Sequence, residues 1–213
     1  MSPKSVLSIS LLFNAIFLLL FASMAIIYRD KILQRFVIWK GDAKIVMFGN
    51  SITAQGKWVE LLGRTDVVNS GLPGLCTHHF VELLQSQVIQ LKPKVCFVMA
   101  GINDITVGVS QRKIQSNYQL ILEKIKMSNI TPIVTLTLYE QNDRESQNEV
   151  EQLNTFLTQY CIKNKIEYLN LNEFLSDSSG LRPEYAVDKT HLNYAAYKIW
   201  ATEIQKILKR KGI

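Results

Sequence analysis

Four short segments of this 213-residue chain carry the chemical groups that acyl transfer requires. The groups are a hydroxyl, glycine backbone N–H groups, a carboxamide, and a carboxylate close to an imidazole. In chain order the segments are Gly49-Asn50-Ser51, Asn69-Ser70-Gly71, Gly101-Ile102-Asn103-Asp104 and Asp188-Lys189-Thr190-His191. These groups can react together only where the fold brings the four segments to one place.

The apolar pattern predicts the elements that must position these segments. Five runs have the length, composition and boundaries typical of strands: residues 44–48, 67–69, 95–100, 133–138 and 166–171. Stretches with one apolar face, typical of helices, follow the third, fourth and fifth of these runs. This alternation predicts a single three-layer α/β/α domain around a parallel sheet. In such sheets, sites form beyond the carboxyl ends of the strands, where the first three segments begin.

With these four blocks in this order, the chain resembles the SGNH hydrolases, also called the GDSL esterase/lipase family. The resemblance extends from residue 44 to about residue 208, and Asp188-Lys189-Thr190-His191 is especially similar to the family's D-x-x-H block. It implies a flavodoxin-like SGNH fold in residues 44–213, with a mostly five-stranded parallel sheet. It also implies a serine ester hydrolase that uses neither a metal nor another cofactor.

The resemblance gives each member of a catalytic triad a role. Ser51 matches the nucleophile, His191 the base, and Asp188 the carboxylate that orients the imidazole, a contribution that some family members manage without. Taken alone, a serine between a strand and a helix is more often a helix N-cap, and an aspartate near a helix is often a cap or a surface residue. The other two histidines, His78 and His79, are expected at the surface or at the rim of a pocket.

Gly71 and Asn103 match the family's oxyanion hole. The resemblance builds this hole from the backbone N–H groups of Ser51 and Gly71 and from the side-chain amide of Asn103. Outside the family, a glycine at such a point commonly serves a turn with positive φ, and asparagine is a common turn former. The first block departs from the usual Gly-Asp-Ser, since Asn50 replaces the aspartate and removes a negative charge. That aspartate is not a triad member, so we expect activity to survive.

Residues 1–28 read as a transmembrane anchor or a signal segment. The run from Val6 to Ile27 is almost wholly apolar, and a helix of that length would span about 33 Å, close to the thickness of a bilayer core. Ser23-Met24-Ala25 is a candidate cleavage site for a signal peptide. The apolar run continues past that site, which favours a retained anchor. A mature chain that begins near Ile26 would contradict the anchor.

Two features of the sequence give opposite predictions for the side of the membrane on which the rest of the chain lies. More positive charge follows the apolar run than precedes it, which by the positive-inside rule would leave the large domain in the cytoplasm. A short N-terminal tail before a signal-like helix favours export, and we expect an exported domain, periplasmic or extracellular. Residues 29–43 read as a spacer before that domain.

Composition excludes several classes of protein. Hydrophobic residues make up 47% of the chain, which excludes a disordered chain, and three cysteines cannot form a disulfide scaffold. The net charge of +6 is divided between the flanks of the apolar run and the remaining chain, with no basic stripe for nucleic acid. Three histidines and scattered acids suggest no metal cluster.

The expected substrate is a small ester or an acylated glycan, most simply a short acyl ester such as acetyl on a carbohydrate. The reason is that the domain is compact and has no long insertion for a deep acyl tunnel. A lysophospholipase or thioesterase is the alternative, and a catalytically silent module of the same fold is a second one. A flavodoxin-like nucleotide binder would need a phosphate loop that Gly49-Asn50-Ser51 does not provide. The oligomeric state cannot be predicted from these patterns.

Overall fold

The computed structural model of the protein describes residues 3–27 and 43–213. By its internal contacts the chain divides into two compact units, residues 1–40 and residues 41–213. The expected spacer, residues 29–43, lies outside the described residues except for Ala43. The sheet and all four segments singled out above belong to the second unit.

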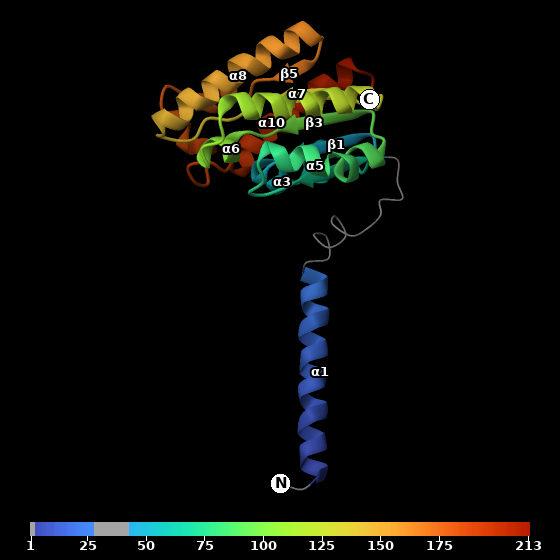
Figure 1. Cartoon of the computed structure of the whole chain (residues 1–213). Helices are drawn as coiled ribbons and strands as arrows, with labels where there is room; N and C mark the ends of the chain where they lie inside the picture. The colour runs from blue at the N-terminus through green and yellow to red at the C-terminus, as the bar shows by residue number, and fades with distance from the viewer. Residues whose placement is uncertain (1–2, 28–42) are drawn as a thin grey trace. The chain divides into compact units, whose positions relative to one another are not determined.

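The second unit is built on five parallel strands in the order β2-β1-β3-β4-β5, as Figure 1 shows in part. The strands are β1 (Ile45–Gly49), β2 (Val67–Gly71), β3 (Val95–Met99), β4 (Thr131–Thr135) and β5 (Glu167–Leu169). The predicted parallel sheet of five strands is therefore confirmed. The order changes direction between β1 and β3, and the carboxyl ends of these two neighbours are where a site in such a sheet is expected.

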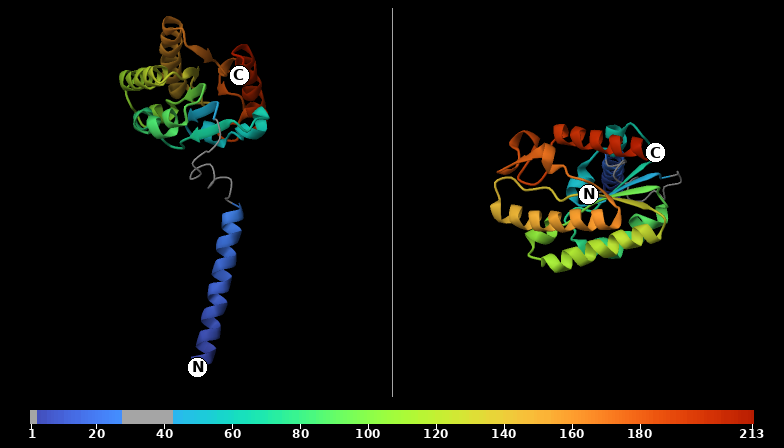
Figure 2. Two further views of the ribbon diagram at one scale, coloured as in Figure 1. Left: turned by 90° about the vertical axis from the view of Figure 1, so that its right-hand side faces the viewer. Right: turned by 90° about the horizontal axis from the view of Figure 1, so that it is seen from above.

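Helices cover both faces of this sheet, with α10 on one side and α7 and α8 on the other (Figure 2). Helices and short turns of the unit are α3 (Ser51–Gln55), α4 (Trp58–Leu62), α5 (Thr77–Gln87), η1 (Ile89–Leu91), α6 (Ile102–Thr106), α7 (Gln111–Met127), α8 (Arg144–Asn164), α9 (Asn172–Leu175), η2 (Pro183–Tyr185) and α10 (Tyr194–Arg210). This is the expected three-layer α/β/α arrangement.

Alternation along the strands divides the core into two clusters. Ile45 and Met47 pack on the face that α4 and α10 cover, whereas Val46 and Phe48 pack on the face that α5, α7 and α8 cover. Both faces of β1 are buried, which explains why its sequence is continuously apolar rather than alternating.

The fourth strand differs from its prediction, because it runs over residues 131–135 rather than 133–138. It pairs with β3 from Thr131 onward, and past its last residue the N–H of Leu136 still donates to the carbonyl oxygen of Leu169 on β5 at 2.9 Å. The backbone leaves the ladder at Thr137. Side chains take over there. Asn154 accepts from the N–H of Thr137 at 2.9 Å, while the amides of Asn154 and Asn172 donate to its carbonyl. Apolar patterning could not show this exchange of partners, because Leu136 and Leu138 remain buried outside the strand.

Two short strands were not predicted. β6 (Ser176–Asp177) and β7 (Gly180–Leu181) form a small antiparallel sheet between α9 and η2. Gly180 has a φ of +96°, and a Cβ built on it would lie 2.0 Å from the carbonyl oxygen of Glu140. Only glycine fits this close approach, which holds the hairpin against the loop that follows β4.

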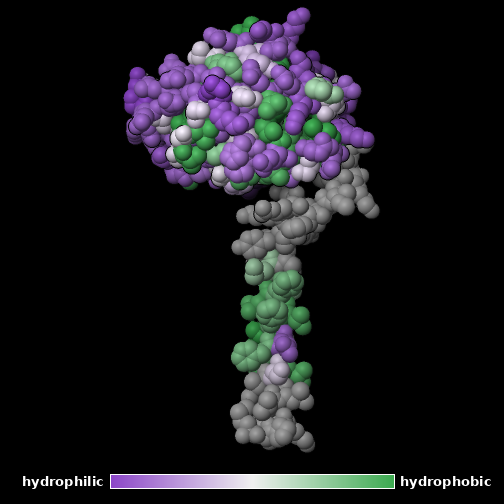
Figure 3. Space-filling model, viewed as in Figure 1, coloured by the Kyte–Doolittle hydropathy of each residue, from purple (hydrophilic) through white to green (hydrophobic). Residues whose placement is uncertain are grey.

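The first unit contains one described helix, α1 (Pro3–Ile27). Its visible side chains are mostly hydrophobic (Figure 3), and Leu11, Phe13 and Phe17 are more than half exposed. Among the described residues, no helix was found that is long and apolar enough to cross a membrane. The predicted transmembrane anchor is therefore not supported.

Candidate active site

Ser51 is the first residue of α3, directly after β1. The preceding Asn50 caps this helix, since its side-chain oxygen accepts from the N–H of Ile52 at 2.9 Å. Ser51 is thus not the cap, and its hydroxyl is left for another partner. Gly49 is required before this turn, because a Cβ there would lie 2.0 Å from the hydroxyl oxygen of Thr53.

The partner of Ser51 is His191, which stands 140 residues further along the chain. The Oγ of Ser51 and the Nε2 of His191 are 2.9 Å apart. On the other side of the ring, Nδ1 lies 2.8 Å from Oδ2 of Asp188 and 3.1 Å from Oδ1. The three predicted triad residues therefore form one hydrogen-bonded row. An imidazole that donates from Nδ1 to a carboxylate presents a free lone pair on Nε2, which is the form that can accept a proton from a hydroxyl.

Aromatic packing holds the two halves of this row together. The hydroxyl of Tyr197 on α10 donates to the carbonyl oxygen of Ile52 on α3, at 2.6 Å. Trp58 on α4 meets Trp200 on α10 edge to face, with ring centroids 4.7 Å apart. These contacts fix the last helix, which follows His191, against the short helix that begins with Ser51.

Asp188 closes its own turn. Its Oδ1 accepts the backbone N–H groups of Thr190 at 2.8 Å and of His191 at 2.7 Å. These two bonds, followed by the one from the His191 side chain, lower the pKa of Asp188 to about 2. The stability that these bonds contribute is therefore complete above about pH 4 and is lost only as the pH falls toward 2.

This ionisation predicts the acid side of the pH profile. Between pH 4 and pH 7 Asp188 keeps its charge, so its carboxyl group should contribute nothing to a loss of hydrolysis in this range. We expect the slope of log kcat/KM against pH, measured on an ester at 25 °C, to be no steeper than about one in this range, because Asp188 adds no protonation of its own. A slope approaching two would mean that the carboxyl group titrates in the same range, contrary to its hydrogen bonding.

Gly71 and Asn103, two of the predicted oxyanion residues, lie at the ends of β2 and β3, the strands on either side of β1, but their donors are partly engaged. Gly71 ends β2, and its N–H donates to Oδ1 of Asn69 at 3.0 Å. One amide hydrogen of Asn103 on α6 donates to the carbonyl oxygen of Leu75 at 3.0 Å, which leaves the second hydrogen of the group. The Gly71 N–H could therefore donate to a substrate only if its bond to Asn69 breaks or is shared with the substrate.

A buried carboxylate joins α6, which carries Asn103, to the start of α5. Asp104 follows Asn103 and is fully buried. It accepts the backbone N–H of Thr77 at 2.9 Å and the Thr77 hydroxyl at 2.6 Å, while Asn117 donates to that same hydroxyl at 2.9 Å. Burial raises the pKa of Asp104, and the bonds from Thr77 act against this rise. Sequence analysis did not single out Asp104 for this role, although it adjoins Asn103.

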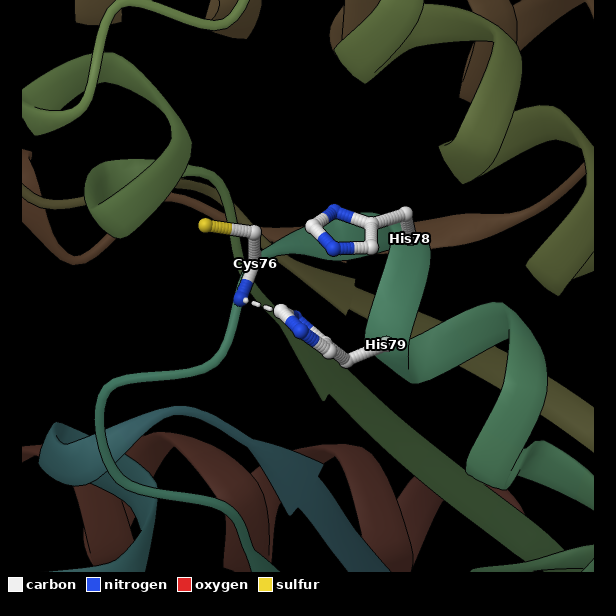
Figure 4. A group of neighbouring side chains, drawn as sticks. All are labelled: Cys76, His78 and His79. Carbon is white, nitrogen blue, oxygen red and sulfur yellow. Dashed lines mark hydrogen bonds between the residues drawn. The ribbon is translucent and has the colours of Figure 1, made fainter.

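Cys76, His78 and His79 gather at the start of α5, and their ligand atoms lie within 4.8 Å of one another (Figure 4). The sequence suggested no such cluster, because it does not show the side-chain orientations that bring these residues together. Nδ1 of His79 accepts the backbone N–H of Cys76 at 3.2 Å, and the Cys76 side chain accepts from the backbone of His79. These bonds form a capping box at the helix start. A metal would have to compete with the cap for the lone pair on Nδ1, so this cluster fits a cap better than a metal site.

The remaining thiols offer no alternative nucleophile. Cys96 and Cys161 are fully buried in the core and form no disulfide. Burial raises the pKa of Cys161 to about 11 and that of Cys96 further still. A thiol in that condition is a poor nucleophile at neutral pH.

A serine, a histidine and an aspartate in one row, at the carboxyl edge of a three-layer parallel sheet, are the arrangement of a hydrolase of the α/β/α class. The chain belongs to the GDSL-like lipase/acylhydrolase family, whose model matches residues 47–199. The resemblance read from the four blocks is thereby confirmed.

Two curated relatives match only part of this chain. An N-acylneuraminate cytidylyltransferase of Streptococcus agalactiae serotype III is 32% identical over 114 residues, which are 51% of this chain and 27% of that protein. The uncharacterized lipoprotein YqeF of Bacillus subtilis is 29% identical over 117 residues, 45% of this chain and 48% of that protein. The chain thus spans less than half the length of either relative. For this chain, export stays a prediction.

Solved structures share the fold. A GDSL-like lipase of Bacteroides thetaiotaomicron superposes with a TM-score of 0.73 at 21% identity, covering 86% of this chain and 96% of that one. An acetylxylan esterase of Geobacillus stearothermophilus superposes with a TM-score of 0.66 at 18% identity, covering 77% and 93%. At these identities the likeness concerns the fold alone.

Proposed function

We propose that the chain is a serine esterase in which Ser51, His191 and Asp188 act as a triad. The observation that carries this proposal is the row of hydrogen bonds, with Ser51 Oγ 2.9 Å from His191 Nε2 and His191 Nδ1 2.8 Å from Asp188. A serine hydroxyl becomes nucleophilic when a base in this position removes its proton. Membership of the acylhydrolase family agrees with such a reaction.

The proposed reaction has two halves. Ser51 Oγ attacks the ester carbonyl while His191 takes its proton, and the imidazolium then gives that proton to the leaving alcohol. Water next attacks the acyl-serine, with His191 again as the base, and the acid leaves. Asp188 keeps the imidazole in the required tautomer and stabilises its charge. The oxyanion would accept hydrogen bonds from the N–H of Ser51 and from the second amide hydrogen of Asn103. The N–H of Gly71 would be a third donor once its bond to Asn69 is broken.

The acyl-enzyme provides the test. Full-length protein treated with a fluorophosphonate probe should carry one adduct per chain, on the peptide that contains Ser51. The adduct should be lost in His191→Ala, since an unactivated serine reacts slowly with such probes. Folded protein that takes up no probe, or takes it up on another serine, would refute the proposed nucleophile.

For the substrate we propose a short acyl ester, such as an acetyl group on a carbohydrate. Support comes from the short connections at the carboxyl edge, where α3 and α6 begin within two residues of β1 and within three of β3. One of the solved structures with this fold is also an acetylxylan esterase. The check is kcat/KM over p-nitrophenyl esters of two, four and eight acyl carbons, followed by acetylated sugars. The proposal expects the highest value for acetyl, and a maximum at eight carbons would favour the lysophospholipase or thioesterase alternative.

A further inference from the structure

A second carboxylate, that of Glu140, lies next to the turn that carries Asp188 and His191, but it is not part of the row of hydrogen bonds between the proposed triad residues. It sits in the loop between β4 and α8 and is only 4% exposed. Its Oε1 accepts the hydroxyl of Thr190 at 2.5 Å, and its Oε2 accepts the hydroxyl of Ser146 at 2.9 Å. Thr190 stands between Asp188 and His191 in sequence, so Glu140 contacts the turn at its centre.

That turn has few buried groups of its own. The side chain of Asp188 is 54% exposed, that of His191 is 27% exposed, and that of Lys189 is 59% exposed. The bonds that Asp188 makes to Thr190 and His191 close the turn internally, but they do not fix its place on the protein. Two bonds to the loop after β4 do so. One is Thr190 to Glu140, and the other runs from the N–H of Gln141 to the carbonyl oxygen of Lys189, at 2.8 Å.

The loop that carries Glu140 is itself held on several sides. The N–H of Tyr139 donates to Oδ1 of Asn172 at 3.0 Å. Asp143 caps α8 through the N–H of Ser146, also at 3.0 Å. Gly180 packs on the carbonyl oxygen of Glu140. Glu140 thus joins an exposed turn to a rigid part of the domain.

We propose that Glu140 is a positioning residue, which sets the distance between His191 and Ser51 by holding Thr190. The inference rests on the proposed triad for its catalytic consequence. Lys189 also approaches Glu140, at 3.4 Å, but an ion pair with so exposed an amine contributes little in water. The hydroxyl bond of Thr190 carries the effect, because a buried carboxylate accepts hydrogen bonds strongly and fixes their direction.

The test removes one hydroxyl at a time from the same carboxylate. Thr190→Val keeps the shape of the side chain and removes the bond to Oε1, whereas Thr190→Ser keeps a hydroxyl. Ser146→Ala is the matched control, because it removes the bond to Oε2 without touching the turn. Small displacements of a base cost tenfold or more in rate. We therefore expect Thr190→Val to lower kcat about tenfold at nearly constant KM, Thr190→Ser to restore most of it, and Ser146→Ala to change kcat less than about twofold.

A second readout does not depend on catalysis. The chain has three histidines, so the ring Cε1–H groups of a histidine-labelled full-length protein give three NMR signals, which His78→Ala and His79→Ala assign. Thr190→Val should displace the signal of His191 and leave those of His78 and His79 in place. Ser146→Ala should leave all of them in place.

These outcomes separate the inference from the proposed function. A displaced His191 signal in Thr190→Val, with the control unchanged, supports the positioning role even if the wild type hydrolyses no ester, in which case only the proposed function fails. An unmoved His191 signal in Thr190→Val overturns the role. An equal displacement in Ser146→Ala overturns it too, because the effect would then be a general loosening of the loop.

Discussion

Replacing Ser51 with alanine is expected to lower kcat for an acetyl ester by about 10⁴-fold or more, because within residues 3–27 and 43–213 Ser51 supplies the one hydroxyl that bonds to Nε2 of His191. The fold should survive. Ser51 does not cap its helix, a task that Asn50 performs, so the free energy of unfolding should change by less than about 1 kcal/mol. Steady-state hydrolysis and urea unfolding of the two proteins, at matched purity, measure both quantities.

Ser128→Ala is a suitable control for this experiment. Ser128 is half-buried directly after α7, where its hydroxyl donates to the carbonyl oxygen of Lys124. The Ser128→Ala variant should hydrolyse the ester at the wild-type rate. Equal activity of wild type and Ser51→Ala would refute the assignment of Ser51, whereas loss of activity together with loss of folding would point to a structural role instead.

The second large effect is expected at His191. His191→Ala should be about as inactive as Ser51→Ala, and the double variant should be no slower than either single one, since the two groups act as a unit. Asp188→Ala should lose about 10²- to 10⁴-fold and keep measurable activity. The difference follows from exposure, because water can reach the half-exposed position of the carboxylate and bond to Nδ1 in its place.

His78→Ala serves as the control here, because His78 is exposed at the start of α5 and is expected to leave kcat unchanged within about twofold. Single-turnover labelling with the fluorophosphonate probe would complement the steady-state rates. An inactive Asp188 variant beside an active His191 variant would reverse the two proposed roles.

Most of the fold could be predicted because the strands are buried on both faces. Ile45 to Phe48 form a continuous apolar run whose alternate side chains enter two different cores, and such runs between amphipathic stretches specify a parallel sheet. The same pattern indicates that the polar blocks stand next to a strand end or a helix start. The roles proposed for Ser51, His191 and Asp188 came instead from the resemblance to the SGNH hydrolases.

Most of what could not be predicted depends on pairs of residues that are far apart in sequence. The bond between Glu140 and Thr190 joins residues 50 positions apart, and nothing in the sequence pairs Glu140 with the block that contains Thr190. The end of β4 is set by two distant asparagines rather than by its own residues. The bond between Gly71 and Asn69 is local, but it depends on the rotamer of the Asn69 side chain, which the sequence does not show.

The span between Ser51 and His191 has a consequence for synthesis. The serine begins the helix that follows the first strand of the domain, and the histidine precedes its last helix. The last helix, α10, reaches back to α3 through Tyr197. A chain made from its N-terminus therefore places the hydroxyl early and its base only near the end. A nascent chain would carry an inert serine until α10 has left the ribosome and docked. The first hydrolytic event would then report that the whole domain has folded.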